Sequence, residues 1–300
     1  SAASDVYKRQ VLRLSAALFG AVLLGALAWH VPAGLALRLS PYKSLSYALL
    51  YPDSRLLSQR WNGFSRVDVV ASSAIRSLPG SSVRCTNPLP PQIGLTVDGD
   101  DLSPISLVGP RLERLAFTDC VLTALPYRLR PNGRALVLEP RGGFEVLVAL
   151  SQGAQTVDVV EPNPLVVAAV RDQGEAAGNL YDDPRVSVAT EEARAFVRRT
   201  RARYDVVALA LTSAYHPVAS GAYSLAEDYR LTREALTDYL GRLQPGGLLV
   251  ILRWLQVPPS EELRAFGLAA EALERTGNRP ADSLVAVSYT HLTLPTIYSV

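Results

Sequence analysis

The sequence contains no methionine, only two cysteines and only three histidines among its 300 residues. Because translation starts at methionine, its absence predicts that the chain is a fragment of a longer protein. Cys85 and Cys120 fit neither a metal-binding spacing nor a redox motif, so we interpret them as buried thiols. One of the histidines, His291, lies close to the C-terminus, which leaves too few for a histidine-based metal site. We therefore expect no metal cofactor.

Charge is sparse and evenly mixed. The chain has 30 Lys and Arg against 28 Asp and Glu, with a formal net charge of +2. It has no run of five or more basic residues. Nucleic-acid binding domains carry a basic patch, so we expect no nucleic-acid partner. The sequence also lacks the Gly-x-Ser-x-Gly elbow of hydrolases, a Walker loop and zinc-ligand spacing.

Both ends of the chain look foreign. The DNA of residues 5–10, written in plausible codons and reverse-complemented, can be read in a shifted frame as residues 287–292. One short DNA element in opposite orientations explains both ends, and both peptides resemble translated sequencing adapters. We attribute residues 1–10 and 287–300 to such adapters and leave them out of functional reasoning.

Residues 15–37 contain no charged side chain and are flanked by Arg13 and Arg38. An apolar stretch of about 20 residues spans a bilayer, and Trp29 suits the aromatic belt at a membrane surface. We predict a membrane helix over residues 11–38. The alternatives are a signal peptide, for which the apolar region is too long, and a buried core helix.

Residues 39–130 are rich in proline, glycine and serine. Residues 64–70 alternate like a strand, and residues 93–97 run into the turn pair Asp98-Gly99. We predict a small β-rich lobe with a core of aromatic residues: Tyr42, Tyr47, Tyr51 and Trp61. The acids around this turn, which are Asp98, Asp100 and Asp101, are interpreted as a solvated loop, with cation or amine binding as the alternative.

Residues 134–164 are typical of a βαβ unit. A buried strand at 135–138 leads through the turn Gly142-Gly143 to a helix at 144–151, and a second strand at 156–160 ends on Glu161. Glycines at a helix N-terminus let a ligand approach the backbone. A carboxylate about 20 residues further on is placed to accept hydrogen bonds from ribose hydroxyls. The alternative is a βαβ unit without a ligand, in which Gly-Gly serves only the turn.

The alternation of strand and helix continues to residue 286. We predict strands at 186–189, 204–211, 248–252 and 283–286, and helices at 191–200, 225–243 and 260–275. This order indicates an α/β fold over residues 131–286, a Rossmann-like, methyltransferase-type, doubly wound and mostly parallel sheet. Ligands of such sheets bind at the carboxyl ends of the strands, near the switch point. We expect one crevice there, bordered by residues 139–143, Glu161, Glu191 or Glu192, and residues 212–216.

Eight motifs follow one another along the chain in this order: LTVDGD, RALVLEPRGG, VVEPNP, DDPRVSV, EEARAF, YDVVALALTS, YSLAEDY and LQPGGLL. Together, over residues 42–286, they resemble the spermidine synthase (polyamine aminopropyltransferase) family, and more closely its bacterial relatives with a membrane-embedded N-terminal half. The resemblance implies a β-rich lobe before a methyltransferase-like Rossmann domain, and S-adenosylmethionine or its decarboxylated form as ligand. It also implies a homodimer in the bacterial inner membrane whose α/β domain faces the cytoplasm. Arg38 and Lys43 support that orientation.

The chain departs from the family where aminopropyl transfer is catalysed. Arg141 stands where the Gly-rich loop of the family has an Asp. The family's Asp-x-x-Asp falls on Ala210 and Ser213, and its Tyr-His-Glu falls on residues 117–119. General-base and positioning effects are each worth about 10²–10⁴-fold in rate. We therefore do not expect polyamine synthesis itself.

The positions that hold a nucleoside are retained. By the resemblance, Glu161 meets the ribose and Glu192 the adenine amino group. The candidate cofactor-binding residues are Glu139, Arg141, Gly142, Gly143, Glu161, Glu192 and Thr212, and the candidate substrate-binding residues are Asp98, Asp119 and Tyr223. His216 and Asp119 are the candidates for acid–base catalysis. His216 is alternatively a structural loop residue, and Tyr223 a packing residue.

Arg141 is the clearest clue to the charge of the ligand. A guanidinium beside a helix N-terminus favours a carboxylate or phosphate and repels a sulfonium amine, which favours S-adenosylmethionine over its decarboxylated form. Alternatively, Arg141 pairs with Glu139 or Glu145 and touches no ligand.

The sequence thus predicts a membrane-anchored transferase of methyl or aminopropyl groups. The alternative is a non-catalytic, nucleoside-binding or regulatory module. A polar general base in the crevice would favour the transferase, whereas a crevice with only Thr212, Ser213 and His216 would favour the module. A nicotinamide dehydrogenase is disfavoured, because the first turn lacks Gly-x-Gly-x-x-Gly.

Overall fold

The computed structural model describes residues 2–29, 39–82, 84–211, 228–254 and 261–287. The chain divides into two compact units, Ser1–Ser40 and Pro41–Val300. The first unit contains one long helix, α1 (Ala2–Trp29). Its window Gln10–Leu27 is apolar and unburied, and by length and composition it suffices to cross a membrane. The predicted membrane helix is thus a helix as far as residue 29, and residues 30–38 lie outside the described residues.

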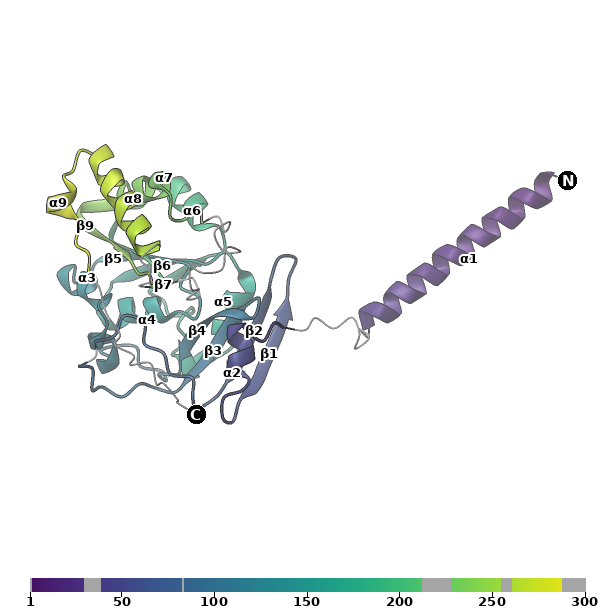
Figure 1. Ribbon diagram of the computed structural model, residues 1–300, viewed down its shortest axis with the longest axis horizontal. Helices are drawn as coiled ribbons and strands as arrows, with labels where there is room; N and C mark the ends of the chain where they lie inside the picture. The colour runs from purple at the N-terminus through teal and green to yellow at the C-terminus, as the bar shows by residue number, and fades with distance from the viewer. Residues whose placement is uncertain (1, 30–38, 83, 212–227, 255–260, 288–300) are drawn as a thin grey trace, which may run out of the picture. The chain divides into compact units, whose positions relative to one another are not determined.

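The second unit begins with an antiparallel sheet of four strands in chain order: β1 (Arg55–Trp61), β2 (Arg66–Ala71), β3 (Gln92–Val97) and β4 (Asp100–Ser106) (Figure 1). Aliphatic side chains of its inner face, such as Val67, Val69 and Leu95, join the main core. Asp98 and Gly99 both have left-handed backbone, as a two-residue hairpin turn requires. The predicted β-rich lobe is therefore present.

The predicted aromatic core of this lobe is wrong. Tyr42, Tyr47, Tyr51 and Trp61 are between 38% and 83% exposed. The outer face of the sheet is instead covered by a short helix, α2 (Ser44–Ala48), through Leu45 and Ala48. Positions three apart share one face of a helix, so these two small or aliphatic residues turn inward while Tyr47 turns outward.

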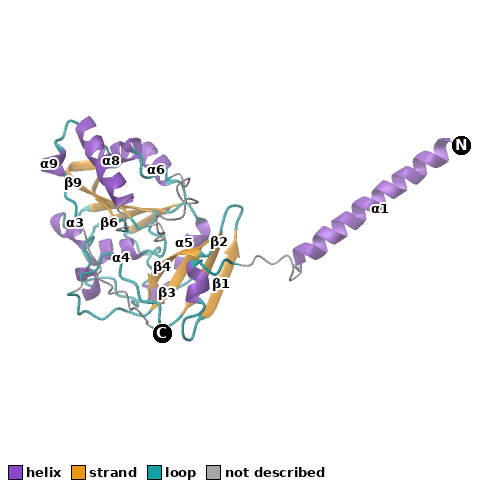
Figure 2. Cartoon of the chain, in the orientation of Figure 1, coloured by secondary structure: helices purple, strands orange, loops and turns teal. Residues whose placement is uncertain are grey.

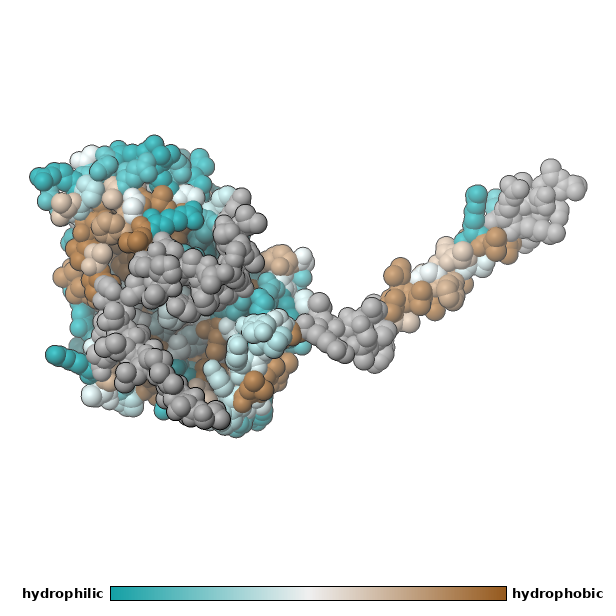
Figure 3. All heavy atoms as spheres, in the orientation of Figure 1, coloured by the Kyte–Doolittle hydropathy of each residue, from teal (hydrophilic) through white to brown (hydrophobic). Residues whose placement is uncertain are grey.

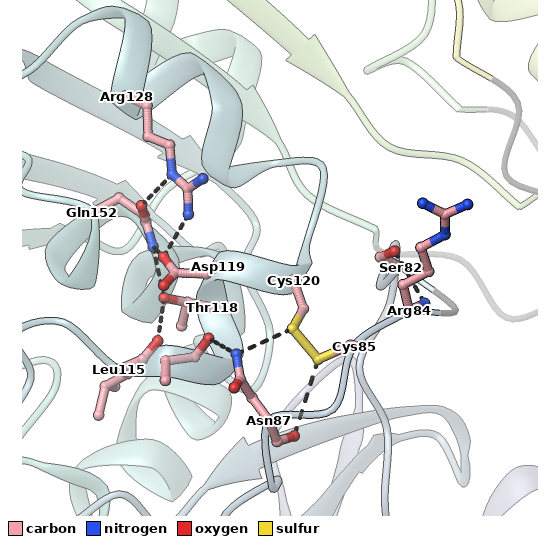
Figure 4. The surroundings of a disulfide bond; sticks show 11 residues. Ser82, Arg84, Cys85, Asn87, Leu115, Thr118, Asp119, Cys120, Arg128 and Gln152 are labelled. Atoms are coloured by element: carbon pink, nitrogen blue, oxygen red, sulfur yellow. Dashed lines mark hydrogen bonds and ion pairs between the residues drawn. A yellow bond between two sulfur atoms is a disulfide. The ribbon is translucent and has the colours of Figure 1, made fainter.

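The cysteines form a disulfide, so the prediction of buried thiols is wrong. Cys85 and Cys120 are 35 residues apart in sequence, but their Cα atoms lie 5.4 Å apart. Backbone bonds bring the two loops together, with Ser82 N donating to Cys120 O and Leu122 N to Gly80 O. Asn87 lies beside the disulfide (Figure 4), and its side-chain amide donates to the carbonyl of Ala116. Rules based on cysteine spacing recognise motifs of residues close together in sequence, whereas Cys85 and Cys120 are brought together by tertiary contacts.

Two short elements lead from the lobe to the parallel sheet, η2 (Ala116–Cys120) and α3 (Ala124–Leu129). The sheet has five strands: β5 (Arg134–Leu138), β6 (Thr156–Val160), β7 (Val186–Ala189), β8 (Tyr204–Leu209) and β9 (Leu243–Ile251). Their order is β7-β6-β5-β8-β9 and every neighbouring pair is parallel. The side chains of β5 alternate between two hydrophobic cores, one on each face of the sheet. Ala135 and Val137 join one core, and Leu136 and Leu138 join the other.

Helices cover both faces of this sheet. On one face lie α4 (Phe144–Ser151) and α5 (Pro164–Arg171), followed by the turn η3 (Gly174–Ala177). On the other lie α6 (Ala193–Arg199), α7 (Arg233–Leu240) and α8 (Glu261–Arg275). Figure 2 shows the two groups of helices on either side of the strands. The predicted doubly wound α/β fold is confirmed.

The helix predicted at 225–243 is shorter than expected, because α7 spans only Arg233–Leu240 and Leu243 already belongs to β9; residues 225–227 lie outside the described residues. Two strands also differ from the prediction. The strand predicted at 248–252 begins at Leu243, because Leu243 already pairs with Tyr204 and β9 continues through an irregularity before Leu248 pairs with Val206. The strand predicted at 283–286 is wrong. Pro280 opens a short helix, α9 (Pro280–Ser283), and the following residues to 287 are irregular. Proline suits the first turn of a helix because it lacks only an N–H that has no intrahelical partner.

Candidate functional site

The loop from β5 to α4 is held in an unusual backbone conformation. Glu139 and Arg141, neither of them glycine, have φ values of 51° and 54°. Such left-handed residues persist only where their surroundings hold them. Here Arg141 N donates to the Glu161 carboxylate at 3.3 Å, and the Tyr181 hydroxyl donates to Arg141 O at 3.3 Å. The loop therefore presents Arg141 in a fixed position at the carboxyl end of β5.

The two glycines of this loop serve close packing. A Cβ atom on Gly142 would lie 2.3 Å from the Pro104 carbonyl oxygen of β4, and one on Gly143 would lie 2.6 Å from a methyl group of Leu180. The N–H of Gly142 donates to the Ser103 hydroxyl at 3.1 Å. Glycine is thus needed at 142 for the lobe to approach the loop. A ligand contact at these two residues stays a prediction.

A cavity of about 320 Å³ opens beside this loop. It lies at the carboxyl ends of β5, β8 and β9, where β5 and β8 form the switch point at which α/β sheets bind their ligands. The β-rich lobe closes its other side. Its lining comprises Pro140, Arg141, Phe144, Glu145, Ala210, Leu211, Leu252 and Trp254 from the parallel-sheet domain, and Tyr42, Ser44, Tyr47, Ser77, Pro79 and residues 101–104 with Asp100 from the lobe.

Glu145, in the first turn of α4, is the buried acid of this cavity. Only 5% of the residue is exposed. Among the described residues, its Oε1 atom has no hydrogen-bond partner. Burial raises the pKa of Glu145 to about 7, and the nearby Thr123 hydroxyl opposes that rise. Burial and the charge of Glu145 in turn raise the pKa of Tyr127. A carboxyl that changes charge near neutral pH can take up or release a proton in a reaction.

Arg141 brings the opposite charge to the same cavity. Within the described part of the chain, its guanidinium forms no ion pair, and its buried Nε atom has no hydrogen-bond partner. The alternative pairing with Glu139 or Glu145 is not formed. Glu139 is engaged elsewhere, accepting a 2.7 Å bond from Arg230.

The acidic residues of the lobe differ in their exposure and in their hydrogen-bond partners. Asp100 accepts from Ser44 Oγ at 2.8 Å and from Lys43 Nζ at 3.2 Å. Burial raises the pKa of Asp100, but these two partners outweigh it and leave the pKa below its usual value. Asp100 and Asp101 line the cavity. Asp98 is exposed, and its carboxylate accepts from Arg66 N at 2.9 Å, which stabilises the hairpin turn.

Glu161 lies at the tip of β6, as expected, and is fully buried. Its carboxylate accepts N–H bonds from Arg141 at 3.3 Å and from Asn163 at 3.2 Å. Burial raises its pKa to about 7, and the positive charge of Arg141 opposes the rise. Glu161 therefore ties the β6 tip to the β5–α4 loop. Its contact with ribose stays a prediction.

A buried charge network that the sequence did not reveal lies behind the loop. Arg230 bonds both Glu139 and Asp228, at 2.7 Å each. Arg253 donates to the carbonyls of Leu252 and Ala210, joining the ends of β8 and β9. Burial lowers the pKa of Arg253 to about 10. These residues come from distant parts of the chain, so no local motif marks them.

The remaining candidates that the structure describes do not line the cavity. Glu192 is exposed at the N-terminus of α6. Asp119 pairs with Arg128 and accepts from Gln152 beside the disulfide (Figure 4). Thr212, His216 and Tyr223 fall outside the described residues. Over the described ranges, no group of three or more His, Cys, Asp or Glu side chains is arranged to hold a metal ion.

Sequence reasoning passed over Glu145 except as a partner of Arg141. One signal could have marked it: α4 reads FEVLVALS and is buried along its whole length, and Glu145 is its single charged residue. An acid inside an otherwise apolar, fully buried helix requires an explanation, since burying a carboxyl without partners is costly.

No protein-family model matches this chain, and no curated protein matches it. Solved structures of spermidine synthases do. One, in complex with the transition-state analogue AdoDATO, aligns with a TM-score of 0.46 at 15% identity. Another, from Thermotoga maritima, aligns with a TM-score of 0.46 at 16% identity. Each alignment covers 74% of this chain and 63% of the other, so the chain spans less than two thirds of their length.

Proposed function

We propose that this chain is a membrane-anchored, spermidine synthase-like transferase that binds an S-adenosyl-type nucleoside. The observation that carries the proposal is the pair of opposite charges in one cavity at the switch point. They are the guanidinium of Arg141, which has no ion pair among the described residues, and the buried carboxyl of Glu145. Glu161 and Glu192, at the ends of the second and third parallel strands, are the proposed partners of ribose and adenine.

Arg141 selects the ligand in this proposal. A guanidinium binds a carboxylate strongly, and more so where water is partly excluded. S-adenosylmethionine has a carboxylate on its methionine end, whereas the decarboxylated form has only the amine. The proposal is therefore that S-adenosylmethionine is preferred.

Glu145 supplies the proton acceptor that the sequence seemed to lack. Ala210, at the position of a family carboxylate, lines the cavity without an acidic group. An acceptor amine must lose a proton before it attacks the carbon beside the sulfonium, and a carboxyl with a pKa of about 7 is suited to accept it at neutral pH. From S-adenosylmethionine the group transferred is methyl, and S-adenosylhomocysteine leaves as the thioether. An aminopropyl group comes only from the decarboxylated form, which leaves methylthioadenosine.

The alternative function is a non-catalytic, nucleoside-binding or regulatory module. Ala210 favours it, and so does the engagement of Glu161 in hydrogen bonds to the loop backbone. Binding of a nucleoside without any transfer of a methyl or aminopropyl group to amines would support this module over the transferase.

The test is calorimetric titration of the full-length protein in detergent with S-adenosylmethionine, its decarboxylated form and methylthioadenosine. The parent should bind S-adenosylmethionine, and Glu161→Ala should abolish binding of all three. Arg141→Ala should weaken S-adenosylmethionine alone, by roughly tenfold, because only that ligand has the carboxylate. Equal binding of S-adenosylmethionine by parent and Arg141→Ala would exclude the role of Arg141. No binding of any of the three would end the transferase proposal.

Placement in the bacterial inner membrane with the α/β domain in the cytoplasm belongs to the same proposal, because the nucleoside is supplied there. The disulfide argues for the other side, since disulfides persist in oxidising compartments. Alkylation of intact cells with a membrane-impermeant thiol reagent, before and after reduction, decides between them. Labelling of Cys85 and Cys120 only after reduction, without cell lysis, would overturn the cytoplasmic placement.

A further inference from the structure

The β-rich lobe has an exposed apolar surface that its own fold leaves uncovered. We define the outer face as Leu49, Leu50, Leu56 and Trp61, all large apolar residues with at least 40% of their surface exposed. They come from the turn after α2 and from β1, which is an edge strand. Figure 3 shows apolar residues on this part of the lobe among hydrophilic ones.

Strand register places the β1 residues on the same side of the sheet as α2. Leu56 pairs with Val70, and Trp61 pairs with Arg66. Directly paired residues point to the same side of a sheet, and successive residues alternate. Val67 and Val69 point into the main core. Arg66 and Val70, with Leu56 and Trp61 opposite them, therefore point outward, toward the side that α2 covers through Leu45 and Ala48.

The position of this face in the chain indicates its occupant. It begins at residue 49, shortly after the predicted membrane span ends at residue 38, and α1 ends at Trp29. An extended chain reaches at most about 3.6 Å per residue, so a lobe tethered to a membrane helix in this way stays close to the lipid surface. Tyrosine and tryptophan are the side chains enriched in the interfacial layer of membranes.

We propose that the outer face of the lobe rests in the headgroup layer of the membrane that α1 spans, so that the chain is held by two contacts, the helix and this face. The inference rests on the membrane anchor of the proposed function, and on nothing about the nucleoside. Shallow insertion of apolar and aromatic side chains into the interface is how monotopic surfaces bind lipid. Pairing with a second copy through the same face is the competing outcome.

The three tryptophans of the chain allow a direct test. They are Trp29 at the end of α1, Trp61 on the outer face and Trp254 beside the cavity. Three full-length variants, each with two tryptophans replaced by phenylalanine, are reconstituted into vesicles whose lipids are brominated on the acyl chain close to the glycerol. Fluorescence quenching then reports contact of each tryptophan with lipid. We expect about twofold quenching of Trp61 and Trp29, and little of Trp254.

The outcomes separate the two proposals. If Trp29 is quenched and Trp61 is not, the lipid contact of the outer face is overturned, whereas the membrane anchor is supported. A concentration-dependent crosslinked dimer would then assign the outer face to contact with a second copy. Absence of quenching for both would refute the anchor itself. In a Leu50→Ser, Leu56→Ser variant the quenching of Trp61 should fall toward the level of Trp254. A Leu263→Ser variant, at an exposed leucine of α8, should leave it unchanged.

Discussion

The tip of β6 and the first turn of α4 each bury a glutamate at the carboxyl edge of the parallel sheet, but the two regions treat the charge differently. At the β6 tip, Glu161 accepts two backbone N–H groups and lies near Arg141. At the start of α4, Glu145 has an Oε1 atom without a partner among the described residues, and only the Thr123 hydroxyl favours its charged form. Both have a pKa of about 7.

This contrast indicates which of the two carboxyl groups can take up a proton in a reaction. A carboxylate that organises a loop through backbone N–H groups is constrained, because moving it leaves buried donors unsatisfied. A carboxyl beside a cavity, with a free oxygen, can accept a proton or an amine without breaking existing bonds. We therefore assign a binding and organising role to Glu161 and the proton-accepting role to Glu145.

The largest effect is expected from Glu161→Ala. It removes the acceptor of one buried and one partly buried N–H group. A buried donor left unsatisfied costs about 1–3 kcal/mol, so the free energy of unfolding should fall by about 3 kcal/mol. The loss should be greatest near pH 5, where the parent carboxyl is neutral. Thermal and denaturant unfolding of the full-length protein in detergent, followed by circular dichroism, measures it. Glu161→Gln keeps an acceptor oxygen and is the control, and equal stability of the two variants would contradict the organising role.

Glu145→Gln is expected to act in the opposite direction, because it should reduce the loss of stability that the parent shows at higher pH. Because the folded-state pKa of about 7 exceeds the usual 4.5, the folded protein binds more protons between these values, and stability falls as pH rises through this window. The shift corresponds to roughly 3 kcal/mol. The variant should lose about that much less stability than the parent between about pH 5 and about pH 8. Glu192→Gln, at an exposed position, should show the parent's drop. A parent-like drop in Glu145→Gln would disprove the raised pKa.

A smaller effect is expected from Arg141→Gln in the Glu145→Gln background, where Glu161 is the remaining buried carboxyl of the pair. Removing the positive charge beside Glu161 should raise its pKa further, so the fall in stability moves up by about one pH unit. Stability measured across neutral pH reports the midpoint. An unchanged midpoint would mean that Arg141 does not act on Glu161.

The smallest effect is expected from Thr123→Val. The hydroxyl of Thr123 favours the charged form of Glu145, so its loss should raise the pKa of Glu145 by roughly half a unit, and leave Glu161 alone. Infrared spectra of the carboxyl groups across neutral pH follow both titrations. A shift in Glu161 instead would show that the two regions are coupled.

Local pattern was sufficient for the elements of the parallel-sheet domain. The strand at 156–160, the helix at 144–151 and the acid that follows at Glu161 coincide with β6, α4 and the β6 tip. These elements are short apolar runs between turn signals, and their period is a property of neighbouring residues. Sequence reasoning failed at the start of β9, which begins at Leu243 rather than at residue 248, and at the strand expected at 283–286, where a short helix forms.

The candidate site was predicted only in part. Arg141 and the position of Glu161 followed from the loop and the strand end. Glu145 did not, because its burial depends on α3 and on the lobe closing over the first turn of α4. Asp119 was expected at the site, but Arg128 and Gln152 hold it beside the disulfide.

Three features follow from residues that are close together in the chain, and local sequence therefore specifies them. They are the alternation of strand and helix, the apolar N-terminal helix and the identity of the charges near the switch point. Only the tertiary structure decided that Cys85 meets Cys120, that Arg141 is left without an ion pair among the described residues, and that Trp61 faces outward. Those outcomes depend on which distant segments pack together, and burial and pairing are what convert a residue type into a charge state and a role.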